Sequence, residues 1–169
     1  MKIAIECPAR RAVANILREA RLNWRLSRLS DTLERLDPVI QLAASGCELI
    51  PGPGSRQGSA TSTRHWARGA IRLAASCAYL LGRADALDEL IRLAQQQWGD
   101  DATLLQLAAR AAMDDARMED SIALIRRAGT LAPCRPRLLE LVGRLEAKAG
   151  HFDEALAAVR AVKPARAAG

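Results

Sequence analysis

Neighbouring acidic residues are the first features that could do chemistry, because paired carboxylates can hold a metal ion or act as acid and base. They occur at Asp100-Asp101, Asp114-Asp115 and Glu119-Asp120. Each pair falls where the sequence pattern predicts a helix start or a turn, and carboxylates are favoured there by capping and by the helix dipole. We therefore interpret these pairs as structural and predict no metal site.

Histidine and cysteine offer no recognisable catalytic arrangement. His65 and His151 are far apart, and neither has a zinc-like spacing from a cysteine. No Cys-x-x-Cys pair joins the four cysteines, Cys7, Cys47, Cys77 and Cys134. Phosphate-binding loops, dinucleotide-binding glycines and a serine nucleophile motif are also missing. We therefore expect no catalytic residue, no cofactor and no enzyme activity, and we expect reduced thiols, as in a cytoplasmic protein.

A repeat of 34 residues organises the second half of the chain. The segment from Gly150 to Leu156 aligns with the segment from Ala116 to Ile122, and a second step of 34 leads back to Gly82. Because small, turn-forming residues stand at the same position of three consecutive repeats, we predict three equivalent bends between antiparallel helices. The three copies are 68–101, 102–135 and 136–169.

This period resembles the tetratricopeptide-repeat (TPR) family, whose unit is a helix–turn–helix of 34 residues. The third copy is the most similar, with Gly143 in its first helix and the turn Gly150-His151-Phe152-Asp153-Glu154-Ala155. The large aromatic residue of the family pattern is replaced by Ile71, Leu105 and Leu139. The resemblance implies an all-α fold, a TPR-like α-solenoid of three helical hairpins. Small bacterial type III secretion chaperones for translocators are similar in length and layout.

Composition agrees with stacked helices and divides the chain into three parts. Half of the residues are apolar but only 3% are aromatic, so the core must be built from Ala and Leu. A stretch rich in Gly, Pro, Ser and Thr predicts a flexible linker at 51–63. It separates an N-terminal helical segment, 1–50, from the repeat array, 64–169. Within the array the patterns predict helices at 64–81, 85–97, 101–113, 118–129, 136–149 and 153–162, with Ser62 or Thr63 as the first cap and Pro164 as the last stop.

The N-terminal segment leaves several alternatives open. In residues 2–7 the more apolar side chains alternate with the others, as in a short strand. This segment is an extended arm, a strand added to a partner's sheet, or a frayed terminus. Residues 9–36 have helical spacing but change apolar face, so the helix breaks near Asn23 or Ser30-Asp31, or one long helix serves two neighbours. Asp37-Pro38 predicts the start of a short helix, 39–45. A coiled-coil-like run predicts an N-terminal interface at Leu22, Leu26, Leu29, Leu33 and Leu36.

The net charge of +6 favours acidic partners. At 100° per residue, the arginines of the N-terminal segment fall within an arc of about 120° around the helix axis. This arginine stripe could bind phosphates. We do not favour nucleic acid, because aromatic residues for base stacking are nearly absent apart from Trp24, and a charged stripe is usually a solvated face. The stripe comprises Arg10, Arg11, Arg18, Arg21, Arg25, Arg28 and Arg35.

The TPR resemblance also implies a concave groove lined by the first helix of each hairpin. Such a groove would be basic and would suit an extended peptide with acidic residues or a free carboxylate. Tyr79 and Met113 would supply apolar anchors, whereas the family's carboxylate clamp is not reproduced. The expected groove residues are Arg72, Tyr79, Gln106, Arg110, Met113, Arg137, Arg144 and Lys148.

The last hairpin has no capping helix after it, so Leu156, Val159 and Val162 are expected to lie open. A second copy, another protein or the N-terminal helices would have to cover them. No apolar run is long enough to span a membrane, and no secretory signal is evident. We therefore expect a non-catalytic, cytoplasmic adaptor or chaperone that holds a protein or peptide partner.

Overall fold

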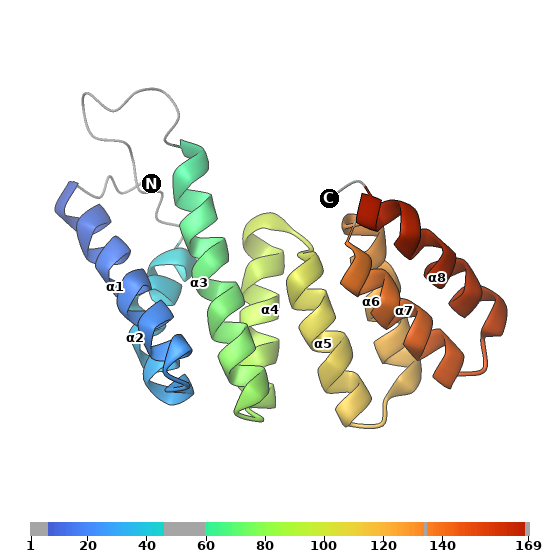
Figure 1. The fold of residues 1–169 in the computed structure, drawn as a ribbon. Coiled ribbons are helices and arrows are strands. Elements are labelled where there is room, and N and C mark those ends of the chain that lie inside the picture. The colour runs from blue at the N-terminus through green and yellow to red at the C-terminus, as the bar shows by residue number, and fades with distance from the viewer. Residues whose placement is uncertain (1–6, 46–59, 134, 168–169) are drawn as a thin grey trace. The chain divides into compact units, whose positions relative to one another are not determined.

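The computed structural model describes residues 7–45, 60–133 and 135–167, and this part of the chain is all-helical (Figure 1). The predicted strand at 2–7 and most of the predicted linker therefore lie outside the described residues, except that Cys7 begins a helix. No described helix is long and apolar enough to cross a bilayer. The helices are α1 (Cys7–Arg25), α2 (Leu29–Ala44), α3 (Ala60–Leu80), α4 (Ala84–Trp98), α5 (Ala102–Asp114), α6 (Met118–Leu131), α7 (Pro136–Lys148) and α8 (Phe152–Ala167).

The helices form two compact units, Met1–Trp98 (unit 1) and Gly99–Gly169 (unit 2). Unit 1 contains α1 to α4 and unit 2 contains α5 to α8, and within each unit every helix packs against the next in sequence. The first predicted repeat, α3 and α4, therefore belongs with the N-terminal helices. The boundary between the units falls after Trp98, not in the predicted linker at 51–63.

Four turns of one geometry join the helices into hairpins. Gly82, Ala116 and Gly150 all have positive φ, of 66°, 61° and 84°, so the three predicted bends are confirmed. Ser27, with a φ of 57°, makes a fourth bend that the repeat did not reveal. At each turn the next amide donates to the carbonyl five residues back, which is the bond of a Schellman motif. These bonds are Arg28 N to Asn23 O, Arg83 N to Ala78 O, Arg117 N to Ala112 O and His151 N to Glu146 O, at 2.8–2.9 Å.

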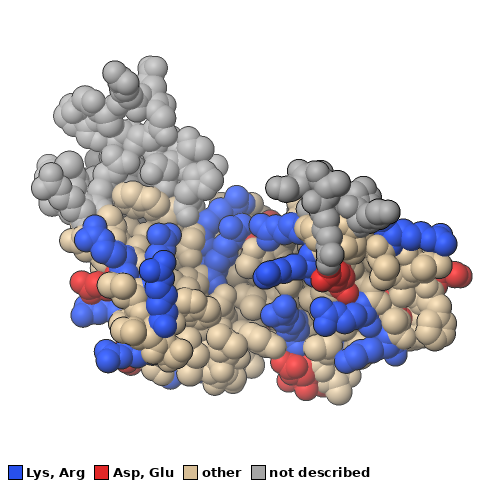
Figure 2. All heavy atoms as spheres, in the orientation of Figure 1, with Lys and Arg blue, Asp and Glu red and all other residues tan. Residues whose placement is uncertain are grey.

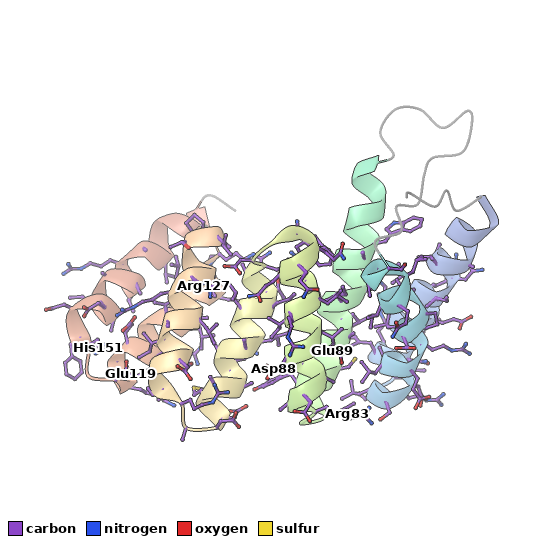
Figure 3. All side chains as sticks on the ribbon, turned by 180° about the vertical axis from the view of Figure 1, so that it is seen from behind. Arg83, Asp88, Glu89, Glu119, Arg127 and His151 are labelled. Carbon is purple, nitrogen blue, oxygen red and sulfur yellow. The ribbon has the colours of Figure 1, made fainter. Side chains whose placement is uncertain are left out.

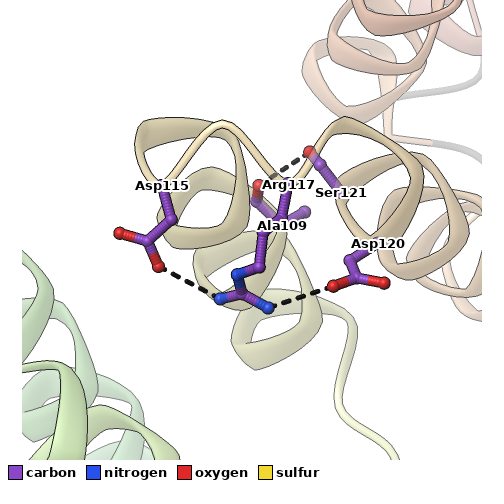
Figure 4. A network of polar contacts seen from close by, with 5 residues as sticks. All are labelled: Ala109, Asp115, Arg117, Asp120 and Ser121. Carbon is purple, nitrogen blue, oxygen red and sulfur yellow. Dashed lines mark hydrogen bonds and ion pairs between the residues drawn. The ribbon is translucent and has the colours of Figure 1, made fainter.

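Small residues let the two helices of a hairpin approach closely. Seven residues before each bend stands a buried Ala or Gly: Ala20, Ala75, Ala109 and Gly143. Ser121, across from Ala109, is fully buried and donates its hydroxyl to the Ala109 carbonyl at 2.7 Å (Figure 4). A Cβ added at Gly143 would lie 3.3 Å from the Ala155 carbonyl oxygen and 3.2 Å from the Val159 side chain, so this crossing is tight and a larger residue would push the helices apart slightly.

Each unit encloses its own core. In unit 2 Leu105, Ile122 and Ile125 pack with Leu138 and Leu145, which joins α5, α6 and α7. In unit 1 the fully buried residues include Leu36, Ile71, Leu87 and Cys77. Burial raises the pKa of the Cys77 thiol to about 11, so this free cysteine is an inert core residue.

Three predicted helix boundaries are wrong, and the first two share a cause. Pro38 lies inside α2 and Pro164 inside α8, so neither proline starts or stops a helix. A proline removes one backbone donor, and here a packed helix continues through that loss. α3 begins at Ala60, ahead of the predicted caps Ser62 and Thr63. The N-terminal helix breaks at 26–28, between the two predicted places.

Candidate partner-binding groove

An open groove runs between α5 and α7 in unit 2. Gln106 and Arg110 line it from α5, and Arg137 and Arg144 line it from α7. These are four of the eight residues that the repeat phase predicted for a groove. Leu141 and the largely buried Leu138 are the leucines among its lining residues, and its volume is about 830 Å³. We call this feature the arginine groove.

The connection before α7 fixes one wall of the arginine groove. Arg135 has extended backbone at the helix N-cap, and Pro136 follows in the first turn, where proline needs no hydrogen-bond acceptor. The Arg135 guanidinium donates to the Thr103 hydroxyl at 3.2 Å, which ties this connection to the start of α5. Arg135 also lines the groove, and sequence reasoning missed it because a residue between helices carries no periodic signal.

The charge of the arginine groove is strongly unbalanced. Among the described residues that line it, four are arginines and one, Glu140, is acidic. Arg110, Arg137 and Arg144 are exposed, and none of them forms an ion pair within the described part of the chain. Lys and Arg side chains gather on the face of unit 2 drawn in Figure 2. Guanidinium groups with exposed donors can take up carboxylates in pairs.

A buried carboxylate holds the α7 side of this unit in place. Glu146 is only 1% exposed, and Arg126 of α6 donates to both of its oxygens at 2.6 and 3.0 Å. The Nδ1 of His151, in the turn before α8 (Figure 3), lies 2.9 Å from the same carboxylate. Burial alone would raise the pKa of Glu146, but the hydrogen bonds from Arg126 and His151 outweigh burial and hold it below its ordinary value.

The other predicted groove residues lie elsewhere. Met113 is half-buried and packs against the unit 2 core, so it is not an open anchor. Lys148 is exposed in the last turn of α7 and does not line the arginine groove. Arg72 and Tyr79 belong to α3 in unit 1, where both are half-buried. Their place in a common groove therefore stays a prediction.

The five leucines predicted as an N-terminal interface do not form one stripe. Leu22 and Leu26 are exposed at the end of α1 and in the turn, whereas Leu29, Leu33 and Leu36 belong to α2. Leu36 is 0% exposed, so it belongs to the core of unit 1 and does not lie on an open surface. The break at 26–28 interrupts the 4-3-4-3 spacing, because the chain reverses direction there.

Three carboxylates of the acidic pairs, those of Asp101, Asp115 and Asp120, take part in local structure. The Asp101 carboxylate caps α5 by accepting from the amides of Thr103 and Leu104 at 3.0 and 3.4 Å. Arg117 bridges Asp115 and Asp120 at 3.1 Å each across the α5–α6 turn (Figure 4). Among the described residues no group of three or more His, Cys, Asp or Glu could hold a metal ion.

A smaller basic pocket in unit 1 involves the predicted arginine stripe. Arg18, Arg21 and Arg25 of α1 and Trp66 of α3 line a space of about 340 Å³. The sequence pattern gave no sign of Trp66 there, because α1 and α3 are far apart along the chain. Elsewhere in the stripe Arg35 pairs with Glu19 at 3.4 Å, so that arginine is already partly neutralised.

No protein-family model matches the chain, and no curated protein sequence matches it. The site must therefore be interpreted from its own geometry and charge.

Proposed function

We propose that unit 2 binds an acidic, extended segment of a partner protein in the arginine groove, and that the protein acts as a non-catalytic adaptor or chaperone. The observation that carries this proposal is the set of exposed arginines, Arg110, Arg137 and Arg144, which form no ion pair with any described residue and line the groove together with Leu141. A peptide with alternating carboxylates and small apolar side chains would meet both features. Exposed guanidinium groups also make the groove attractive from a distance, so association should be fast at low salt.

The proposal includes a TPR-like α-solenoid as the architecture of the whole chain. Four hairpins with one turn geometry support it, together with a spacing of 34 residues between the last three bends. The bend at Ser27 lies 55 residues before Gly82, so the first hairpin would be a repeat separated from the others by an insertion. In such an array the first helices of the hairpins would line one surface, and two first helices, α5 and α7, supply the lining of the arginine groove.

The groove is tested by fluorescence polarisation with a labelled ten-residue peptide that carries four glutamates and a free C-terminal carboxylate. The double variant Arg110→Glu/Arg137→Glu should weaken binding by at least about tenfold, which corresponds to about 1.4 kcal/mol. A matched control, Arg83→Glu/Arg92→Glu, makes the same charge change on exposed arginines of unit 1. Equal weakening by both pairs would mean that only net charge attracts the peptide, and the groove proposal would fail.

Nucleic-acid or other polyanion binding by unit 1 is the second candidate. The observation that favours it is Trp66 beside Arg18, Arg21 and Arg25, because an indole can stack on a base while guanidinium groups contact phosphates. The test is binding of a labelled single-stranded 20-mer over a salt series. Arg18→Glu/Arg25→Glu should abolish binding if this candidate is correct, whereas Arg110→Glu/Arg137→Glu should leave it nearly unchanged.

A further inference from the structure

The last hairpin exposes an apolar face on α8. The equivalent face of the preceding hairpin, on α6, is buried. Leu156 and Val159 of α8 are 47% and 57% exposed, and Phe152 is 73% exposed. The predicted exposure of Leu156 and Val159 is thereby confirmed, while Val162 is half-buried. With Gly143 and Ala147 of α7 these three side chains line a shallow, mainly apolar hollow of about 600 Å³. We call the surface of Phe152, Leu156 and Val159 the α8 face.

The repeat shows what kind of element such a face receives. Thirty-four residues before Phe152, Leu156 and Val159 stand Met118, Ile122 and Ile125, all of which pack in the unit 2 core. There the occupant is a helix, α7, which brings Leu138 and Leu145 onto α6. Ile122 and Ile125, which α5 and α7 cover together, are only 3% and 0% exposed. By analogy with α6, the equivalent positions on α8, Phe152, Leu156 and Val159, therefore form a surface suited to bind a helix, and no described helix covers it.

Charge specifies the occupant further. On α6 the residue after Ile125 is Arg126, and it pairs with Glu146, the residue after Leu145 on the docked helix. On α8 the residue after Val159 is Arg160, which is exposed and forms no ion pair with a described residue. Arg160 thus stands where a helix docked like α7 would place its glutamate.

We propose that the α8 face binds an amphipathic helix of a partner protein that carries two leucines seven residues apart, followed directly by a glutamate that pairs with Arg160. This goes beyond the arginine groove, since it concerns the α8 side of α7 and a helical instead of an extended ligand; Glu140 and Arg144 line both hollows. A second copy of the chain fits less well. Its exposed leucines at the end of α1 and in the turn after it, Leu22 and Leu26, are accompanied by Arg21 and Arg25, which would repel Arg160.

The chain itself supplies a probe for this test. A fluorescein-labelled peptide with the sequence of residues 135–149 carries the leucine pair and the glutamate of α7. A lactam between Glu140 and a lysine introduced by Arg144→Lys holds the peptide helical, because an isolated helix of this length is marginal in water. We expect the 169-residue chain to bind this peptide with a Kd on the order of 10–100 μM.

Variants of the protein then locate the binding site. Val159→Asp should weaken binding at least about tenfold, and Arg160→Glu should weaken it about fivefold. Arg92→Glu, an equal charge change on an exposed residue of α4, should have no effect. A peptide with Glu146→Arg should bind Arg160→Glu protein better than wild type. The helical content of each variant, measured by circular dichroism, should stay unchanged, because Val159 and Arg160 are exposed.

Several outcomes would overturn the proposal. One is no binding of the lactam peptide at millimolar concentration, and another is binding that neither Val159→Asp nor Arg160→Glu changes. In the second case the peptide would be displacing the protein's own α7 and contacting Arg126. Sedimentation equilibrium of the protein alone tests whether a second copy of the chain occupies the α8 face. A dimer that Val159→Asp converts to monomer would assign the α8 face to a second copy. Since Arg110 and Arg137 take no part here, failure of this proposal is distinguishable from failure of the arginine groove.

Discussion

The residue at the bend of each hairpin has left-handed backbone, yet only two of the four are glycine. Gly82 and Gly150 adopt positive φ without steric cost, whereas Ser27 and Ala116 carry a Cβ in the same region. For an L-residue with a side chain this conformation costs roughly 1–2 kcal/mol. The chain therefore stores a small strain at two of its turns.

Exchanging residues between the bends tests that strain. Ala116→Gly should raise the free energy of unfolding by roughly 0.5–1 kcal/mol, because the relief of strain exceeds the added entropy of the unfolded chain. The reverse change, Gly82→Ala, should lower it by a similar amount, and nothing lies within 4 Å of the added methyl group, so the effect comes from the backbone alone. Urea unfolding followed by circular dichroism measures both. Equal effects of the same sign would contradict this account.

At the scale of elements, Glu146 joins three of them through one carboxylate: Arg126 of α6, its own helix α7, and His151 of the next turn. Its folded pKa is lowered, so its contribution to stability is fully present above its ordinary value of 4.5 and is lost as the pH falls through the folded pKa.

The variant Glu146→Gln should therefore be less stable than wild type at pH 7, by about 1–3 kcal/mol, because hydrogen bonds to a buried charged group are lost. The difference should shrink when urea unfolding is repeated at pH values below 4.5, where the unfolded carboxyl is already protonated. Glu89→Gln removes an exposed carboxylate as a control and should change stability by less than about 0.5 kcal/mol. A pH-independent loss would show that shape, and not charge, is what Glu146 supplies.

The sequence predicted three of the hairpin bends correctly but placed several helix boundaries wrongly. Period and turn chemistry predicted the bends at Gly82, Ala116 and Gly150, since a left-handed turn demands a small residue. The bend at Ser27 was missed because serine is not a turn signal there and the 55-residue spacing to Gly82 hides the period. Pro38 and Pro164 were taken as helix boundaries, although packing can hold a helix together across one missing donor.

Some residues of the arginine groove could be expected from the sequence, because they lie in regular helices, and others could not. The groove positions implied by the TPR resemblance include Gln106, Arg110, Arg137 and Arg144, and these four line one hollow between α5 and α7. Phase does not say how far a side chain near a helix end is drawn into the core, and Met113 was therefore misplaced as an open anchor. Residues in connections have no phase at all, so Arg135 could be found only from coordinates.

For the whole molecule, the division into two units makes a prediction about folding. Each unit has its own buried core, and all three tryptophans, Trp24, Trp66 and Trp98, belong to unit 1. Tryptophan fluorescence therefore reports on unit 1, while circular dichroism at 222 nm reports on the helices of both units. The two probes can separate the unfolding of one unit from that of the other.

The variant Ile125→Ala removes a fully buried side chain from the unit 2 core and should destabilise that unit by about 2–4 kcal/mol. We expect part of the circular dichroism transition to move to lower urea while the fluorescence transition stays in place. Ile71→Ala, an equally buried isoleucine of unit 1, should move the fluorescence transition instead. If Ile125→Ala moves both probes together, the two cores unfold as one cooperative array, because repeats coupled strongly through their interfaces lose stability jointly.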